Sequence, residues 1–280
     1  MIKEITKITN SEVDFLNLQE NHISIQLSLD GFSFAVYNKI QNELGAFAVY
    51  EFENNSITPF KHLELIEQLF NQDDLLQLKY ESVNVTHFNN LVTQVPHPFF
   101  NKEHLAQYLQ NTVKVLKNDF ITYDEVINTE IINVYIPFVN INNFLLDKYG
   151  VFIYKHSSTI LIEKLLNNYK NLEGDYCFVN VSKNNLDIVV LKNKKLELFN
   201  SFNFTTKEDF IYYILFTAEQ LNLYPEELNL VLLGDIEKES ELFTILYQYV
   251  RNVTFYKPTN FPSILNEISS HSYFTLLNQL

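Results

Sequence analysis

The stretch His22-Ile-Ser-Ile-Gln-Leu-Ser-Leu-Asp-Gly-Phe-Ser-Phe-Ala-Val-Tyr37 decides the fold of this chain. Apolar and polar residues alternate on both sides of Asp30-Gly31, a pattern typical of two half-buried strands joined by a tight turn. A two-residue Asp-Gly loop would pair Leu29 with Phe32 and place the apolar side chains of both strands on one face. The segment Gly45-Ala-Phe-Ala-Val-Tyr-Glu-Phe52 predicts a third strand, which completes an antiparallel meander.

The same pattern occurs a second time, where Tyr176 to Leu191 predicts two strands around a polar turn and Lys195 to Phe202 predicts a third. The segment Val95-Pro-His-Pro98 predicts a loop. The other predicted helices are 62–70, 101–116, 139–149, 158–169, 207–221 and 239–249, and the other predicted strands are 80–87, 120–126, 131–136, 151–154, 228–233 and 252–256. Each half therefore contains a meander, helices and further strands, which indicates an α/β fold with a mixed sheet built twice. We expect two domains, 1–150 and 151–280.

Composition limits the functions that this chain can have. At 280 residues with 46% hydrophobic residues, it can bury one large core or two ordinary ones. The net charge of −14 would repel nucleic acid and polyphosphate, so we expect no nucleic-acid partner. The single cysteine, Cys177, allows no intramolecular disulfide. We see neither an apolar leader segment nor a run of 18 apolar residues, and therefore expect a cytoplasmic protein without a membrane span.

This layout resembles the superfamily of actin, sugar kinases and heat-shock chaperones, in which two ribonuclease-H-like domains clamp ATP between them. More closely, the segment Ile23 to Val36 and the tail His271-Ser-Tyr-Phe-Thr-Leu-Leu277 look like a family of uncharacterised bacterial proteins of unknown function with an actin-like ATPase fold. The resemblance covers essentially the whole chain. It implies two actin-like domains and makes magnesium-ATP the ligand to test for.

The first phosphate loop of that superfamily has the pattern Asp-x-Gly-Ser/Thr after the first strand. At the same place this chain has Gln26-Leu-Ser28, followed by Leu-Asp30-Gly31-Phe-Ser33. Either alignment lacks the metal-facing Asp or the Gly. We expect the Asp30-Gly31 turn to be too tight to wrap a phosphate, and the Asp30 carboxylate to repel one.

The other two nucleotide motifs depart as well. The second phosphate loop, Asp-x-Gly in the superfamily, is Asn180-Val-Ser182 here, and Asn supplies no charge for a magnesium shell. The Gly-Gly of the adenosine motif is Gly234-Asp235. The chain thus keeps degenerate nucleotide-loop positions, and we expect no catalytic residue, no metal site and no bound ATP-magnesium. These positions are Ser28, Asp30, Gly31, Asn180, Ser182, Gly234 and Asp235.

Two further sets of residues have weaker patterns. His87, His97 and His104 lie in a predicted strand, loop and helix without the spacing of a metal site, and we expect scattered surface or capping histidines. Asp30, Asp175 and Asp187 are types that a two-metal nuclease needs. All three lie at or near predicted turns, and we expect them to be solvated.

The favoured hypothesis is a catalytically degenerate actin-like protein that acts as an interaction or scaffold module with a protein partner. One alternative is a divergent ATP-binding protein, an ATPase or kinase that uses the inter-domain cleft, and a second is a small-ligand-binding protein. The helix around Phe210-Ile-Tyr-Tyr-Ile-Leu-Phe216 is rich in aromatic residues. Core packing explains most of it, and any exposed part is a candidate partner surface.

Overall fold

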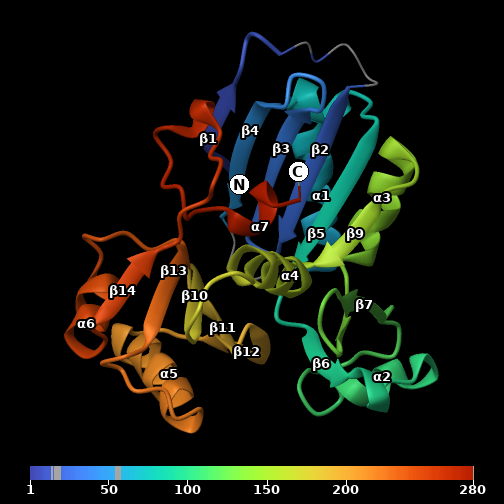
Figure 1. Ribbon diagram of the computed structural model, residues 1–280. Helices are drawn as coiled ribbons and strands as arrows, with labels where there is room; N and C mark the ends of the chain where they lie inside the picture. The colour runs from blue at the N-terminus through green and yellow to red at the C-terminus, as the bar shows by residue number, and fades with distance from the viewer. Residues whose placement is uncertain (14, 16–19, 54–57, 280) are drawn as a thin grey trace. The chain divides into compact units, whose positions relative to one another are not determined.

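The computed structural model describes residues 1–13, 15, 20–53 and 58–279, and its ribbon is drawn in Figure 1. The chain divides into two compact units. The first contains residues 1–160, 262–265 and 275–280, and the second contains residues 161–261 and 266–274.

The first unit contains a six-stranded sheet in the order β1-β4-β3-β2-β5-β9. Strands β2, β3 and β4 form the predicted antiparallel meander, β1 pairs with β4 antiparallel, and β5 and β9 extend the sheet in parallel. The strands are β1 (Ile2–Thr9), β2 (Asn21–Ser28), β3 (Gly31–Asn38), β4 (Glu43–Phe52), β5 (Ser82–Phe88) and β9 (Ile153–His156). Two helices, α1 (Pro59–Gln72) and α3 (Val139–Tyr149), and the short η1 (Asp74–Gln77) also belong to this unit.

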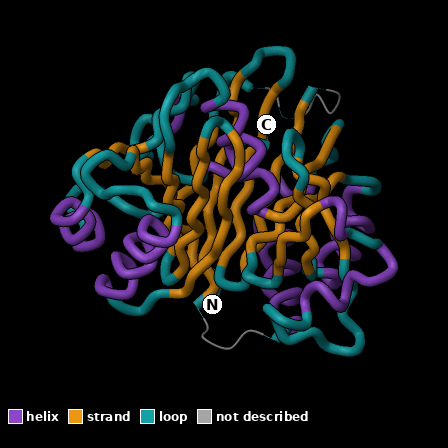
Figure 2. The backbone as a smooth tube through the Cα atoms, turned by 60° about the horizontal axis from the view of Figure 1, so that its bottom comes forward, coloured by secondary structure: helices purple, strands orange, loops and turns teal. Residues whose placement is uncertain are grey.

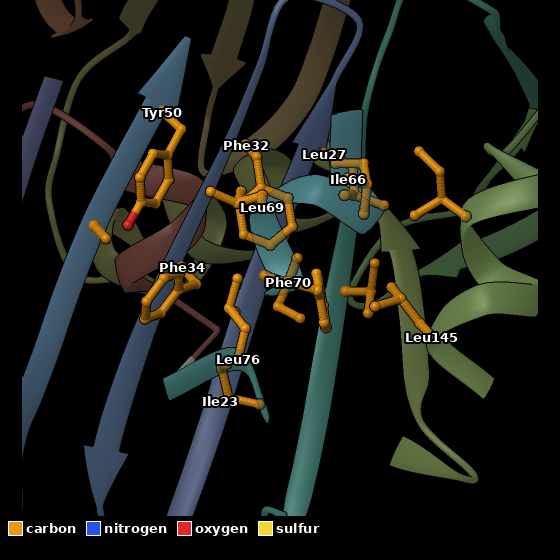
Figure 3. Close-up of a cluster of buried hydrophobic side chains, with 14 of the residues drawn as sticks. Ile23, Leu27, Phe32, Phe34, Tyr50, Ile66, Leu69, Phe70, Leu76 and Leu145 are labelled. Carbon is orange, nitrogen blue, oxygen red and sulfur yellow. The ribbon is translucent and has the colours of Figure 1, made fainter. Parts of the chain in front are cut away.

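One face of this sheet forms the core of the first unit. The side chains of Ile23, Ile25 and Leu27 are completely buried, because alternate residues of a strand point to the same face. They join one apolar cluster with residues of α1 and α3. Figure 3 labels Ile23 and Leu27 of this cluster together with Ile66 and Leu69 of α1. The alternation in the sequence therefore predicted the buried face correctly.

The other face of the same sheet has polar side chains of β2 and β5 beside the buried Ala35 and Phe47, and it holds a distant segment of the chain. The short helix α7 (Phe274–Leu277) is drawn on the opposite side of the sheet from α1 (Figure 1). The Thr275 hydroxyl donates a hydrogen bond to Gln26 Oε1, and the Gln279 side chain donates one to Thr86 Oγ1. The Asn84 amide donates to the Gln279 carbonyl oxygen at 3.0 Å. Residues 275–279 thus cover a strip of polar side chains.

The segment between β5 and α3 forms a small sheet of its own, β6-β8-β7, with a separate apolar cluster. Its elements are β6 (Val92–Pro96), η2 (His97–Phe99), η3 (Lys102–His104), α2 (Leu105–Leu109), β7 (Thr122–Val126) and β8 (Ile131–Tyr135). The loop predicted at 95–98 was wrong in part, since Val95 and Pro96 belong to the edge strand β6, where a proline is tolerated. The helix predicted over 101–116 is reduced to η3 and α2, because Asn111-Thr-Val-Lys-Val favours helix poorly.

The second unit repeats the main sheet. Its five strands have the order β12-β11-β10-β13-β14, with β10, β11 and β12 antiparallel and β13 and β14 parallel to β10. This matches β4-β3-β2-β5-β9 strand for strand, which confirms the duplicated α/β fold; the strands are orange in Figure 2. The strands are β10 (Tyr176–Ser182), β11 (Asn185–Lys192), β12 (Lys195–Asn203), β13 (Asn229–Gly234) and β14 (Asn252–Phe255). The second unit also contains α5 (Lys207–Gln220), α6 (Glu241–Tyr249) and, from residue 161 on, α4 (Ser157–Tyr169), whereas η4 (Ser263–Leu265) belongs to the first unit.

The register of the first hairpin differs from the prediction. Leu27, rather than Leu29, pairs with Phe32, and the two-residue loop is Leu29-Asp30. Gly31 has no positive φ; it already pairs with Ser28 and lies against β4, where a Cβ atom on residue 31 would be 2.9 Å from the Tyr50 carbonyl oxygen. The glycine therefore provides a close approach between strands rather than a left-handed turn. The shift of two residues leaves the buried face unchanged.

Candidate functional site

The first phosphate-loop position is a turn closed by its own side chains. Ser28, at the end of β2, donates its hydroxyl hydrogen to Asp30 Oδ1 at 2.7 Å. The Phe52 amide of β4 donates to the Asp30 carbonyl oxygen at 2.9 Å. Asp30 is exposed at the tip of the turn, as predicted. The turn is thus fixed to β4, and the Ser28 hydroxyl is engaged by a carboxylate.

The resemblance aligns Gln26 with the metal-facing Asp of the superfamily. Its Oε1 accepts a hydrogen bond from the Thr275 hydroxyl. The side chain is a neutral amide and belongs to the polar strip under residues 275–279. An uncharged oxygen that already has a protein donor is a poor partner for a magnesium-bound water.

His62, on α1, lies beside the first turn and was not singled out from the sequence. Its side chain is buried between the rings of Phe52 and Phe138, whose centroids lie 5.8 and 5.1 Å away. Burial lowers the pKa of His62 to about 4, although the Ser28 backbone and the Asp30 carboxylate act in the opposite direction. The sequence did contain a sign that His62 is buried, because this residue lies one turn before Leu65 and Ile66 on the apolar face of the helix. His62 is neutral at pH 7.

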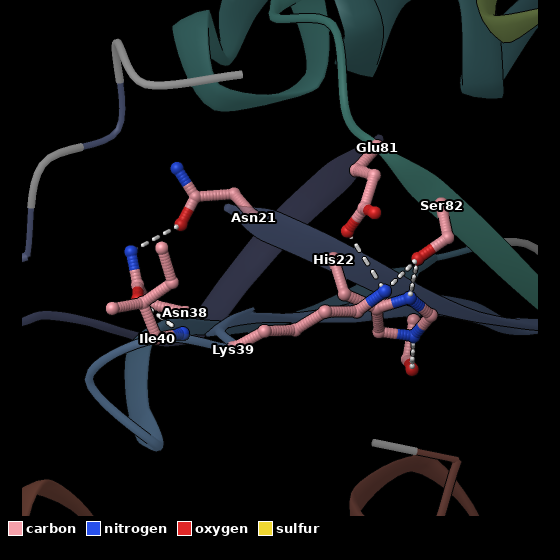
Figure 4. A network of polar contacts seen from close by, with 8 residues as sticks. Asn21, His22, Asn38, Lys39, Ile40, Glu81 and Ser82 are labelled. Carbon is pink, nitrogen blue, oxygen red and sulfur yellow. Dashed lines mark hydrogen bonds and ion pairs between the residues drawn. The ribbon is translucent and has the colours of Figure 1, made fainter. Parts of the chain in front are cut away.

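A second polar network lies at the opposite end of β2 (Figure 4). The His22 ring contacts the Ser82 hydroxyl at 2.8 Å and the Ser24 hydroxyl at 3.1 Å, and Lys39 Nζ lies 2.9 Å from Glu81 Oε2. Burial, and to a smaller extent Lys39, lower the pKa of His22 to about 4. The loop position that the resemblance predicts follows the carboxyl end of this strand, whereas His22 lies at its amino end. This network ties β2, β3 and β5 together.

The three histidines of the sequence hypothesis do not form a site. His97 and His104 are exposed on the small sheet's connections, as expected, whereas His87 is completely buried at the carboxyl end of β5. The Phe138 amide donates to His87 Nδ1 at 3.2 Å, so the ring proton resides on Nε2. Burial, together with the nearby His156, lowers the pKa of His87 to about 3. The expectation of a surface histidine was wrong at this position.

In the second unit the structure brings the other two motifs together. Val181 and Gly234 are neighbours across the parallel pair β10–β13. The Asp235 amide donates to the Val181 carbonyl oxygen at 2.8 Å, and a Cβ atom on residue 234 would lie 3.0 Å from Asn180 Oδ1. Asn180, Gly234 and Asp235 therefore lie at one sheet edge, and Ser182 follows at the start of the β10–β11 turn.

Asp187 is buried in β11, which corrects the expectation of a solvated acid at a turn. Three side chains donate to its carboxylate: Asn180 Nδ2 at 3.4 Å, Asn185 Nδ2 at 3.1 Å and Ser201 Oγ at 2.7 Å. Burial raises the pKa of Asp187, and the three hydrogen bonds oppose this shift. Asn180 is thus a structural donor to a neighbouring strand, with its amide hydrogens directed at Asp187.

The charge pattern of these positions is negative. Asp30 is exposed at the first turn, Asp235 is exposed after β13, and Asp187 is buried in contact with Asn180.

Among the described residues, no group of three or more His, Cys, Asp or Glu side chains could hold a metal ion. No helix in the described ranges is long and apolar enough to cross a membrane. At the loop positions, Ser28 donates a hydrogen bond to Asp30 in the first unit, and Asn180 donates one to Asp187 in the second.

Comparisons with known proteins agree with this fold. Residues 10–253 match a family described as "Protein of unknown function (DUF3822)". A crystal structure from Bacteroides thetaiotaomicron VPI-5482, described as a protein with actin-like ATPase fold and unknown function, is similar with a TM-score of 0.79 and 25% identity; the match covers 89% of this chain and 95% of that one. No curated protein matches the chain significantly.

Two more distant structures share the fold at lower identity. The PilM–PilN type IV pilus biogenesis complex contains a chain with 12% identity and a TM-score of 0.61, matched over 92% of this chain and 96% of that one. The ethanolamine utilization protein EutJ from Carboxydothermus hydrogenoformans has 9% identity and a TM-score of 0.50 over 97% and 91%. At these identities the likeness concerns the fold alone.

Proposed function

The chain belongs to the family described as "Protein of unknown function (DUF3822)" and has an actin-like ATPase fold, and we propose that it is an actin-like protein without nucleotide chemistry that acts as an interaction or scaffold module. The proposal places it in the cytoplasm with a protein partner. It keeps the duplicated sheets and uses them as a rigid support for binding surfaces.

The observation that carries the proposal is the Asn180–Asp187 contact. In a working second loop, the residue at position 180 would direct a carboxylate toward a magnesium shell. Here an amide at that position donates to a buried carboxylate of the next strand at 3.4 Å, with Asn185 and Ser201 as further donors. The side chain is committed to the sheet, so it is unsuited to organising a metal–phosphate group.

The first loop supports the same conclusion. The Ser28 hydroxyl faces Asp30, Gln26 faces Thr275, and the exposed Asp30 carboxylate would repel an incoming phosphate. Asp235 adds a side chain and a charge where the adenosine motif has its second Gly. Neither loop has the residues with which the superfamily binds magnesium-ATP.

A role in protein assembly fits the remaining properties. A net charge of −14 disfavours nucleic acid and polyphosphate as partners. A protein of this fold is part of the PilM–PilN type IV pilus biogenesis complex, which supports the use of the fold in protein contacts. The analogy is one of fold and names no partner for this chain.

Thermal denaturation with and without magnesium-ATP tests the proposal. A ligand present at 1,000 times its dissociation constant stabilises the folded state by about 4 kcal/mol, which raises the melting temperature by several degrees. We expect no rise with 5 mM ATP or ADP plus magnesium, compared with magnesium alone.

A nucleotide-dependent rise would contradict the proposal and favour a divergent ATPase or kinase. The location of any such effect is checked with Ser182→Glu, which adds a carboxylate at the second loop. Gln220→Glu, on the exposed end of α5, adds the same charge elsewhere in the unit and serves as the control. A rise that disappears only in Ser182→Glu would place the nucleotide at the loop.

A further inference from the structure

The outward face of α5 carries a pair of stacked, exposed aromatic rings. Tyr212 and Phe216 are 58% and 41% exposed, and their ring centroids lie 5.8 Å apart with planes inclined by 19°. The rings continue through Tyr213, 5.5 Å from Tyr212, to Phe202 of the edge strand β12, 4.5 Å from Tyr213. We call these four side chains the ring row.

Core packing does not explain the two outer rings. The buried residues of α5 include Phe210, Ile211 and Ile214, which face the sheet. Tyr212 and Phe216 are four positions apart and therefore share the opposite face of the helix. They are absent from the apolar cluster of this unit, whereas Phe202 and Tyr213 pack against it. Exposed aromatic groups of this kind are enriched at protein interfaces and costly to leave in water.

Acidic side chains bracket the outer rings. Glu208 is one turn before Tyr212, and Glu219 is one turn after Phe216; both are exposed. Within the described part of the chain, neither carboxylate has an ion-pair partner. Lys207, the one cation of the helix, lies 3.3 Å from Glu241, and Asp209 is used in the helix cap. Glu208, Tyr212, Phe216 and Glu219 form a stripe along the exposed face of α5. This stripe presents two rings between two uncompensated negative charges.

We propose that this face of α5 docks a positively charged segment of a partner protein, a step that rests on the proposed role as an interaction module. Arginine side chains fit the stripe, because a guanidinium stacks on an aromatic face and pairs with a carboxylate. The two carboxylates are eleven residues, or about 16 Å, apart along the helix. The docking segment of the partner carries cationic side chains at that separation. Between them it has aliphatic side chains that pack on the two rings.

The charge of the chain argues against other occupants. A second copy would bring another chain of net charge −14, in which Arg251 is the single arginine, to the same acidic stripe. Nucleic acid and anionic lipid surfaces would be repelled in the same way. A cationic polypeptide is the class that the stripe attracts.

Fluorescence anisotropy with a defined peptide tests the inference. The probe is a labelled 16-residue peptide of alanine and leucine with arginine pairs eleven positions apart, and its matched partner has glutamate in place of arginine. We expect the arginine peptide to bind the full chain with micromolar affinity that weakens with salt, and the glutamate peptide not to bind. Tyr212→Ala with Phe216→Ala should weaken binding about ten-fold or more.

Two matched charge variants separate a specific site from general attraction. Glu208→Gln with Glu219→Gln should weaken binding at least about five-fold. Glu226→Gln with Glu227→Gln removes the same charge from an exposed loop of the same unit and should leave binding within two-fold. Equal losses in both pairs, or no loss with the ring variants, would overturn the proposal. Circular dichroism checks that each variant is folded.

The outcome is independent of the nucleotide experiment. If magnesium-ATP stabilises the chain while the peptide result holds, the docking face stands and the proposed absence of nucleotide chemistry fails. If the wild type forms dimers that Tyr212→Ala with Phe216→Ala abolishes, a second copy is the occupant and the proposal of a cationic partner is wrong.

Discussion

Gly234 lies so close to Val181 that a Cβ atom on residue 234 would be 2.0 Å from the Val181 carbonyl oxygen. The glycine also has a φ of +82°, a value that other residues adopt at a cost. Gly234→Ala must therefore separate β10 from β13 at this edge. We expect a loss of more than about 3 kcal/mol in the free energy of unfolding, measured by urea denaturation.

Gly150→Ala is the matched control for this substitution. Gly150 has a φ of +78°, but a Cβ atom on residue 150 would meet no atom within 4 Å, so only backbone strain applies. We expect a loss of about 1 to 2 kcal/mol. Equal losses at both positions would show that conformation, and not the contact with Val181, makes Gly234 necessary.

Asn180→Asp restores the charge of a phosphate loop and should weaken the protein. The new carboxylate would replace an amide that lies 3.4 Å from Asp187 Oδ2, and two buried carboxylates at that distance cannot both ionise. The pair would hold a proton more tightly in the folded than in the unfolded state. We expect a loss of about 2 to 4 kcal/mol at pH 7 and a smaller loss at pH 5.

The control for that variant is Asn200→Asp, on the exposed side of β12, whose Oδ1 accepts a hydrogen bond from the Ser201 amide. It should change stability by less than about 0.5 kcal/mol. An Asn180→Asp protein as stable as the wild type at pH 7 would contradict the structural role assigned to Asn180.

Buried histidines should make the protein sensitive to acid. Burial lowers the pKa of His62 to about 4, below the value of 6.5 for an unfolded chain. Protonation therefore favours the unfolded state, and stability present above pH 6.5 is lost as the pH falls toward 4. For His62 alone the loss at pH 5 is about 2 kcal/mol. His22, with a pKa also lowered to about 4, acts in the same direction.

His62→Phe should remove part of this sensitivity, since an aromatic ring fits between Phe52 and Phe138 and has no proton to gain. Unfolding free energies measured at pH 7 and pH 5 should differ by about 2 kcal/mol less in the variant than in the wild type. His97→Phe alters an exposed histidine and should leave the difference unchanged. If both variants keep the wild-type difference, His62 is not a source of acid sensitivity.

Tyr50 and Lys7 share a buried carboxylate. Asp73 is 2% exposed, and its Oδ2 accepts a hydrogen bond from Tyr50 Oη at 2.6 Å and lies 2.9 Å from Lys7 Nζ. Tyr50→Phe removes one donor from this oxygen and should cost about 1.5 to 3 kcal/mol in urea denaturation. Tyr37→Phe removes a hydroxyl whose contact with Asn42 is exposed, and should cost less than about 0.5 kcal/mol. Similar costs for the two would contradict this account.

The sequence predicted the sheets well because their pattern is local. Alternation from Ile23 to Val36 defines which face is buried, whatever the register of the hairpin. The register itself depends on Tyr50, whose carbonyl oxygen lies against Gly31, and no pattern within the hairpin contains that contact. Strand β6 was missed because Pro96 suggested a loop.

The contacts of the candidate positions were accessible from the sequence to unequal degrees. Asn180 and Asp187 are cross-strand partners in β10 and β11, so the hairpin pattern contained their contact, yet Asp187 was expected to be solvated at a turn. Gln26 and Thr275 are 249 positions apart, and only the folded chain shows that the amide has a hydroxyl partner. The burial of His62 depends likewise on Phe138, which follows much later in the chain.

The cover over the polar face of the first sheet has a consequence for biosynthesis. Gln26 and Thr86 receive their partners from Thr275 and Gln279, which are 249 and 193 positions later in the chain. At ribosomal speeds of about 5 to 20 residues per second, those residues emerge about 10 to 50 s after the strands that need them. After α3 has emerged, the apolar side of the nascent first unit can close, while its polar strip stays open to water until residues 275–279 follow.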